Sequence, residues 1–63
     1  MADNSELGLK LREIRSSRSL TLNRLAELTQ LTTSFISQAE RGLVSPSIDS
    51  LRKLAKALDV ELV

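Results

Sequence analysis

The sequence contains no cysteine and no histidine among its 63 residues, and Phe35 is its only aromatic residue. Without cysteine, neither a disulfide nor a thiolate metal site can brace the fold. Without histidine, the chain lacks the commonest general base and the commonest metal ligand. It also lacks a glycine-rich phosphate loop and any serine that a histidine could activate. We therefore predict no catalytic residues, no bound metal and no cofactor, and we expect a protein that is not an enzyme.

Long hydrophobic runs are absent as well. No apolar run approaches the roughly 20 residues that a membrane-spanning helix needs. Residues 1–4 lack the charged and apolar regions of a signal peptide. Together with the missing cysteine, these features favour a cytoplasmic protein with no membrane partner. A chain this short buries only about 60% of the surface that its unfolded form exposes, and it has room for a single domain.

The net charge gives little direction, because its formal value is only +1. The basic residues nevertheless gather in two places. One group lies in the first part of the chain and the other near its end; they are Lys10, Arg12, Arg15, Arg18 and Arg24, and Arg52, Lys53 and Lys56. A basic helix face is more often a solvated surface than a binding site, so these clusters alone identify no partner.

Apolar residues recur with helical spacing along the chain, and no segment alternates as a strand does, which predicts an all-α fold. The expected helices cover residues 5–17, 22–29, 33–41 and 48–58, with the N-caps Ser5, Thr21, Thr32 and Ser47. Gly42 suits the position just past the third helix, because glycine takes a positive φ at no steric cost. The residues expected to face inward are Leu7, Leu11, Ile14, Leu25, Ala26, Thr29, Ile36, Ala39, Ile48, Leu51, Leu54, Ala55 and Leu58.

The most informative stretch runs from Leu20 to Pro46, where two short helical patterns are joined by a tight turn at Gln30 and Leu31. A chain this small has few uses for such a unit. The leading one is to place the second of these helices in the major groove of DNA.

An ordered set of residues along nearly the whole chain resembles the phage-repressor, Cro-like (xenobiotic-response-element) helix-turn-helix family. The matching residues are Leu7-Gly8, Leu11 to Arg15, Leu20-Thr21, Leu25 to Glu27, Ile36-Ser37, Glu40 to Gly42, Pro46-Ser47, Leu51 and Leu54 to Leu58. The resemblance implies a compact bundle of four to five short helices, the lambda-repressor-like DNA-binding domain. It also implies sequence-specific binding of double-stranded DNA and transcriptional regulation, including repression, by a homodimer on an inverted repeat.

Two positions depart from the family pattern. The family often carries glutamine at the first position of the second helix, where it touches a phosphate, but this chain has Leu22. The turn usually holds glycine where this chain has Gln30. We therefore expect no phosphate contact from the Leu22 side chain, and either a left-handed glutamine or a slightly different turn at Gln30.

The third helix, about residues 33–41, carries the side chains that the resemblance places against base edges: Thr33, Ser34, Ser37 and Gln38. Helical spacing puts these four on one face, opposite Ile36. Glutamine pairs bidentately with adenine, while threonine and serine bond a base or touch a thymine methyl. The alternative interpretation is four ordinary solvated polar residues.

Phosphate contacts fix register rather than sequence. We predict them for side chains at the helix ends and in the third connection, namely Asn23, Arg24, Thr32, Arg41 and Ser45. The first amides of the second helix also suit a phosphate. Arg52, Lys53 and Lys56 are expected to face solvent elsewhere. The resemblance further implies a structural ion pair between Arg15 and Glu40. Phe35 is interpreted as partial core, and the alternative is an apolar contact to the sugar-phosphate wall or to a thymine methyl.

Two hypotheses remain about the wider context. Phe35 to Gln38 and Ser45 to Ser47 resemble the cupin-linked subset of the family, and Leu9, Leu28, Leu43 and Val44 look too apolar for an isolated surface. We therefore expect residues 1–63 to be the N-terminal DNA-binding domain of a longer, ligand-responsive regulator of bacterial or phage type, associated with the nucleoid. The alternative function is a protein-interaction module of the same fold, antitoxin-like or coactivator-like.

Overall fold

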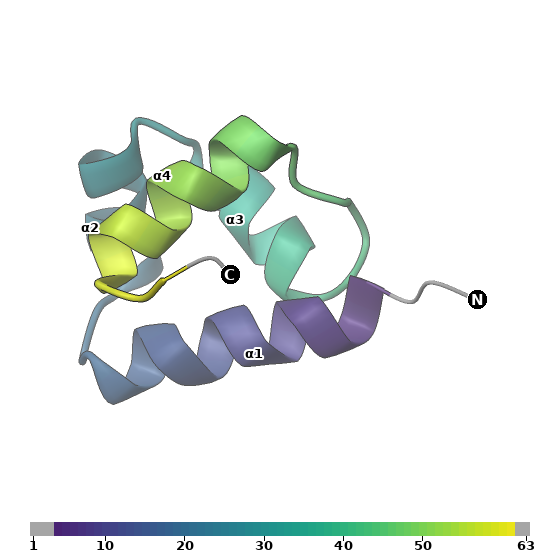
Figure 1. Ribbon diagram of the computed structural model, residues 1–63, viewed down its shortest axis with the longest axis horizontal. Helices are drawn as coiled ribbons and strands as arrows, with labels where there is room; N and C mark the ends of the chain where they lie inside the picture. The colour runs from purple at the N-terminus through teal and green to yellow at the C-terminus, as the bar shows by residue number, and fades with distance from the viewer. Residues whose placement is uncertain (1–3, 62–63) are drawn as a thin grey trace.

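The computed structural model describes residues 4–61, and it contains helices and no strand within that range. The helices are α1 (Asn4–Ser17), α2 (Leu22–Thr29), α3 (Thr33–Glu40) and α4 (Ile48–Leu58). In Figure 1, α1 runs along one side of the molecule and the other three helices gather across from it. α3 packs against both α1 and α2, and α2 also packs against α4. The predicted all-α class and the order of the elements are confirmed.

Hydroxyl side chains start the three later helices, as predicted. The Oγ1 atom of Thr21 accepts a hydrogen bond from the Arg24 amide at 3.0 Å, and that of Thr32 accepts one from Phe35 at 3.0 Å. Ser47 Oγ accepts from the Ser50 amide at 3.1 Å. Each cap satisfies one of the amides that lack an intrahelical partner.

The predicted start of the first helix is wrong by one residue. α1 begins at Asn4, so Ser5 lies inside the helix rather than at its N-cap. α3 is likewise one residue shorter than predicted, because Arg41 is its C-cap with φ −87° and ψ 0°. Helix ends are held by few hydrogen bonds, and local patterns therefore fix them less sharply than helix interiors.

Left-handed residues end several helices. Gln30 closes α2 with φ 61° and ψ 23°, so the turn keeps the family geometry with a glutamine in the position that glycine usually fills. Ser19 and Asp59 also take positive φ, at 57° and 58°, and neither was predicted. Gly42 follows α3 with φ 75°, as expected. Gly42 also lies close to α1, because a Cβ atom on it would be 2.8 Å from the Ser5 Cα.

The core is built from the apolar sides of α2, α3 and α4. Leu25, Ile36, Leu54 and Leu58 are nearly inaccessible to solvent, and each such side chain stabilises the fold by roughly 1.5–3 kcal/mol relative to exposure. Partly buried side chains surround them, namely Leu11, Ile14, Leu20, Leu22, Ala26, Leu31, Phe35, Ala57 and Val60. The interpretation of Phe35 as partial core is therefore confirmed.

Two residues predicted to face inward are exposed to solvent in the structure. Ile48 is 65% exposed, because it is the first residue of α4, in the turn that precedes the buried Leu54 and Leu58. Leu7 is 36% exposed, since it lies in the first turns of α1, away from the main cluster. Helical spacing predicts which face a residue is on, but not how far along the helix its neighbours extend.

Gly8 allows α1 to approach the end of α3. A Cβ atom at this position would lie 2.5 Å from the Ala39 carbonyl oxygen, which is backbone and has no flexible side chain to move aside. α1 therefore braces the C-terminal end of α3 at backbone contact distance.

Candidate nucleic-acid interface

The two sides of α3 differ sharply in their surroundings. Ile36, Ala39 and Glu40 are buried against the rest of the molecule. The opposite side carries the four predicted base-reading residues, which the structure brings together on one surface: Thr33, Ser34, Ser37 and Gln38. Ser34 is exposed and the other three are half-buried. α3 is thus anchored on one side and accessible on the other.

The polar groups on the accessible side are unpaired. None of the four side chains makes a hydrogen bond or ion pair with any other residue in the range 4–61. Three hydroxyls and one carboxamide therefore keep their donors and acceptors available for another molecule. We call these four residues the reading face.

An ion pair anchors the C-terminal end of α3. Arg15 Nε donates to Glu40 Oε2 at 2.6 Å and Arg15 Nη2 donates to Glu40 Oε1 at 3.1 Å, a bidentate contact. Arg15 Nη1 also donates to the Leu20 carbonyl at 2.8 Å. The predicted contact is thus present, and it joins α1, the connection to α2, and α3.

The environment of Arg15 favours its charged form. Only 14% of the Arg15 side chain and 6% of the Glu40 side chain are accessible to solvent. The hydrogen bond to Glu40 raises the pKa of Arg15 above its ordinary value, against the opposite effect of burial. Among the described residues, no buried side-chain nitrogen or oxygen lacks a hydrogen-bond partner. A satisfied buried pair of this kind fixes one geometry, because losing either partner leaves an uncompensated charge.

The predicted phosphate-contacting side chains all lie at the surface. They are Asn23 and Arg24 in the first turn of α2, Thr32 and Arg41 at the two ends of α3, and Ser45 in the connection to α4. Arg41 Nε lies 3.4 Å from the Ser37 carbonyl. Arg24 Nη1 lies 3.5 Å from Glu27 Oε1 in an exposed pair. Exposed pairs of this kind contribute about 0–1 kcal/mol, so Arg24 remains free to take another anionic partner.

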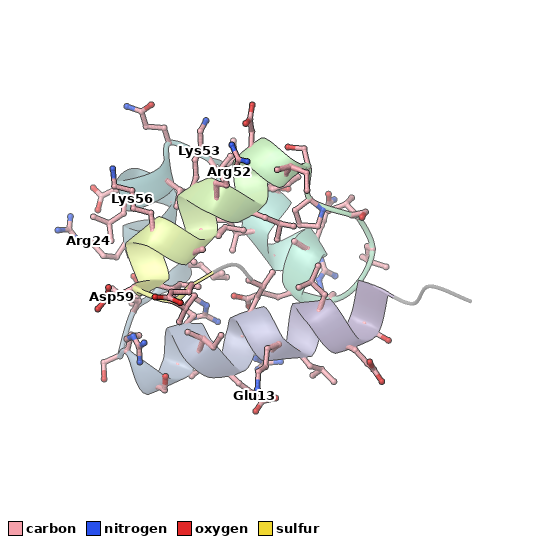
Figure 2. The ribbon with its side chains drawn as sticks, in the orientation of Figure 1. Glu13, Arg24, Arg52, Lys53, Lys56 and Asp59 are labelled. Atoms are coloured by element: carbon pink, nitrogen blue, oxygen red, sulfur yellow. The ribbon has the colours of Figure 1, made fainter. Side chains whose placement is uncertain are left out.

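The second basic cluster lies elsewhere. Figure 2 shows Arg52, Lys53 and Lys56 projecting outward from α4, and all three are exposed. Lys53 and Lys56 line an open hollow of about 530 Å³ beside the C-terminal end of α2, and no residue of the reading face lines it. The structure therefore does not unite the cationic cluster with the reading face.

Arg18 is a basic residue with a defined contact that the sequence did not predict. Arg18 Nε donates to the Leu58 carbonyl at 2.8 Å, and its Nη2 lies 3.5 Å from the Asp59 carbonyl. Arg18 therefore caps the C-terminal end of α4, where carbonyls lack intrahelical partners. No local pattern indicates this contact, because its partners lie about 40 residues away in the sequence.

Neither a metal site nor a membrane-spanning segment is found in the part of the chain that the structure describes. Residues 4–61 hold no group of three or more acidic, histidine or cysteine side chains suited to a metal ion. None of their helices combines the length and apolar character required to cross a bilayer.

Known proteins similar to this chain share its helix-turn-helix pattern. Residues 11–63 match the helix-turn-helix family. The HTH-type transcriptional regulator PuuR of Escherichia coli (strain K12) is 46% identical over 55 residues, which make up 87% of this chain and 30% of PuuR. The immunity repressor protein of Bacillus phage phi105 is 34% identical over 56 residues, or 89% of this chain and 39% of the repressor. The chain therefore spans less than half the length of these relatives.

Solved structures match the fold closely. The restriction-modification controller protein C.AhdI from Aeromonas hydrophila superposes with a TM-score of 0.90 at 38% identity, covering 92% of this chain and 88% of that one. The clp gene regulator ClgR from C. glutamicum also gives a TM-score of 0.90, at 30% identity, covering 94% of this chain and 76% of that one. The similarity thus extends over nearly all of the helices described above.

Proposed function

The chain belongs to the phage-repressor, Cro-like helix-turn-helix family, and we propose that its α3 reads base edges in the major groove of double-stranded DNA. The relatives named above are a transcriptional regulator and a phage immunity repressor, which supports DNA binding in transcriptional regulation as the function of this domain. What is proposed is the way in which this chain's own residues carry it out.

The proposal rests on the difference between the two sides of α3, one buried and the other accessible. Its buried side is fixed by Ile36, Ala39 and the ion pair from Glu40 to Arg15. Its accessible side presents unpaired hydroxyl and amide groups and no charge. A rigid helix with free donors and acceptors suits the major groove, which admits one helix and presents a distinct pattern for each base pair.

Contacts to the phosphates of the DNA backbone would orient α3. The amides at the start of α2 lack intrahelical carbonyl partners, and the positive end of the helix favours an anion there. Asn23 and Arg24 stand beside these amides. Thr32 and Arg41 lie at the two ends of α3, and Ser45 lies in the connection to α4. Five such contacts around one helix would fix its register on the duplex without reading sequence.

The wider assembly is a further part of the proposal. A two-fold homodimer on an inverted repeat would place two copies of α3 about 34 Å apart, or a multiple of that. We propose that this domain forms the N-terminal part of a longer regulator of the cupin-linked subset, associated with the nucleoid. Two features support a longer protein: the relatives' greater length and an apolar groove of about 240 Å³ between α1 and α4.

The alternative of a protein-interaction module is favoured by the exposed Leu9, Leu28 and Leu43, which are 56%, 47% and 64% exposed. It predicts tight binding to a protein and weak binding to any DNA, without sequence preference. Singly exposed leucines are ordinary on small domains, whereas four convergent unpaired polar groups on an anchored helix are not required by folding. DNA reading is therefore the better-supported function.

The test is a selection of duplexes from a random library with the full chain, followed by fluorescence anisotropy. We expect a reproducible enriched sequence that binds more tightly than its scrambled version. Affinity for both duplexes should fall as salt rises from about 50 to about 200 mM, because phosphate contacts release counterions from the DNA. If no sequence is enriched, and binding to every duplex is equally weak, the proposal is wrong.

A further inference from the structure

The reading face carries only a few of the kinds of polar group that proteins use to contact bases. Its side chains are three hydroxyls and one carboxamide, contributed by Thr33, Ser34, Ser37 and Gln38. α3 contains one charged residue, Glu40, and its carboxylate is buried against the Arg15 guanidinium. The accessible side of the helix therefore offers no cation and no carboxylate to a base pair.

These absences bear on which bases the helix can select. In the major groove, guanine is read most often by a bidentate arginine or lysine, and cytosine by a glutamate or aspartate. Adenine is read by a bidentate glutamine or asparagine, and the thymine methyl by small apolar groups such as the threonine methyl. We infer that α3 reads A·T base pairs, with an adenine opposite Gln38. This inference rests on the proposed function and names the class of sequence that the same surface selects.

Gln38 is the residue on which the inference turns, and its backbone is firmly placed. The Gln38 carbonyl accepts a hydrogen bond from the Leu43 amide at 2.9 Å, and the Ala39 carbonyl accepts one from Gly42 at 3.1 Å. Together these bonds form the helix-ending motif that a left-handed glycine permits. The side-chain amide of Gln38 meanwhile has no partner among residues 4–61. A fixed backbone with a free carboxamide is the arrangement that a bidentate contact to adenine N6 and N7 requires.

The other members of the reading face agree with this assignment. Hydroxyls of Thr33, Ser34 and Ser37 can bond several bases, so they do not demand guanine or cytosine. Thr33 also carries a methyl group at the first position of α3. In helix-turn-helix proteins the N-terminal residues of the recognition helix contact base edges, and Thr33 is the first residue of α3. The Thr33 methyl is therefore placed to meet a thymine methyl.

Arg41, which directly follows α3, is better placed to contact the DNA backbone than a guanine base. Arg41 lies beyond the last residue of α3, at the C-cap, and its Nε lies 3.4 Å from the Ser37 carbonyl. Arg41 lies outside the helix and Gln38 lies within it, so the Gln38 side chain is the nearer of the two to the base edges that the N-terminal residues of a recognition helix contact. A guanidinium at the C-cap meets phosphate oxygens first, and those contacts carry no sequence information.

The experiment uses the full chain and the duplex enriched from the random library. We expect one position of this duplex at which the natural chain prefers adenine and the Gln38→Ala variant does not. Replacing that adenine by 7-deazaadenine removes the N7 acceptor, and replacing it by purine removes the N6 amino group. Each replacement removes one of the two hydrogen bonds of the bidentate contact, so it should weaken binding of the natural chain by about 2- to 12-fold. Neither should weaken binding of the Gln38→Ala variant further.

Two substitutions should switch the preference rather than abolish it. Gln38→Glu should favour cytosine at the same position, and Gln38→Arg should favour guanine, because these side chains match those bases. Lys53→Ala, on the exposed face of α4, is the matched control and should leave the preference for adenine unchanged. Equal melting curves for all variants would show that the fold is retained, since each change lies on an accessible surface.

The possible failures are distinguishable. If no duplex is enriched, the proposed function itself fails. If a duplex is enriched but the pair that Gln38→Ala relaxes is G·C, the function stands and the inference is overturned. If the adenine analogues bind the natural chain as well as adenine does, Gln38 makes no contact with N6 and N7, and the inference is likewise overturned.

Discussion

α3 and α4 are built alike but expose opposite chemistry. Both begin at a hydroxyl N-cap, Thr32 and Ser47, and both bury one apolar stripe. The accessible side of α3 is uncharged, whereas that of α4 carries Arg52, Lys53 and Lys56 (Figure 2). Charge alone would favour α4 as the surface for an anionic partner. Charge and the availability of neutral donors and acceptors thus favour different helices, and only contacts to base edges carry sequence information.

The anchoring of the two helices differs as well. α3 is tied to α1 by a buried ion pair and by backbone contact at Gly8, whereas the end of α4 is capped by the exposed Arg18. Buried charged contacts and close backbone contacts tolerate little change. We therefore expect substitutions behind α3 to have large effects on stability, and substitutions on the outer side of α4 to have small ones.

The largest effect is expected for Glu40→Ala. Removing this carboxylate leaves the Arg15 guanidinium buried without its partner, which should lower the free energy of unfolding by about 3–5 kcal/mol. Thermal unfolding followed by circular dichroism measures the change. Glu27→Ala is the control, because it breaks the exposed pair with Arg24 and should cost about 1 kcal/mol at most. An unchanged melting curve for Glu40→Ala would show that the ion pair does not hold α3 in place.

A smaller loss of stability is expected for Gly8→Ala. Alanine normally stabilises a helix relative to glycine by roughly 0.5–1 kcal/mol. Here the added methyl would collide with the Ala39 carbonyl oxygen, so we expect a net destabilisation of about 1–3 kcal/mol. Urea unfolding gives the midpoint. A midpoint higher than that of the natural chain would mean that α1 and α3 separate easily and do not brace each other.

Arg41→Ala should change DNA binding without changing its sequence preference. If Arg41 contacts a phosphate, its loss should weaken binding to matched and scrambled duplexes alike and reduce the salt slope by about one unit. Gln38→Ala should instead leave the salt slope unchanged and weaken binding to the matched duplex only. Measurements at several salt concentrations separate the two effects. Identical behaviour of the two variants would contradict the division into phosphate-contacting and base-reading residues.

The smallest effect is expected for the double substitution Lys53→Ala and Lys56→Ala. Both side chains are exposed and have no partner among the described residues, so stability should change by about 0.5 kcal/mol or less. The salt slope and the ratio of affinities for matched and scrambled duplexes should also stay the same. A slope reduced by as much as in Arg41→Ala would place α4 on the DNA and remove the contrast between the two helices.

Much of the fold could be predicted from sequence, because local chemistry determines it. Hydroxyl caps and helical periodicity located α2, α3 and α4, and Gly42 marked the end of α3. Contacts between distant segments could not be predicted in this way. The capping of α4 by Arg18 and the exposure of Ile48 both depend on where neighbouring elements end. The left-handed Ser19 and Asp59 were missed because local sequence gives little sign of a positive φ in residues other than glycine.

The candidate site was predictable to a similar depth. Helical spacing alone put Thr33, Ser34, Ser37 and Gln38 on one face, and the structure shows them accessible there. The pairing of Arg15 with Glu40 came from the family resemblance, since 25 residues separate the two in sequence. That the reading face is unpaired follows only from the packing of its surroundings. Which base each side chain reads depends also on the shape of the duplex, which the protein sequence does not contain.

An amide chemical-shift titration of the full chain with a mixed-sequence duplex, at low and moderate salt, tests the central claim most directly. We expect shifts concentrated at residues 22–24 and 32–41, weakening as salt rises, with the exposed side of α4 unaffected. Absent shifts at low salt, or shifts centred on Leu9, Leu28 and Leu43 or on Lys53 and Lys56, would contradict the placement of α3 in the groove.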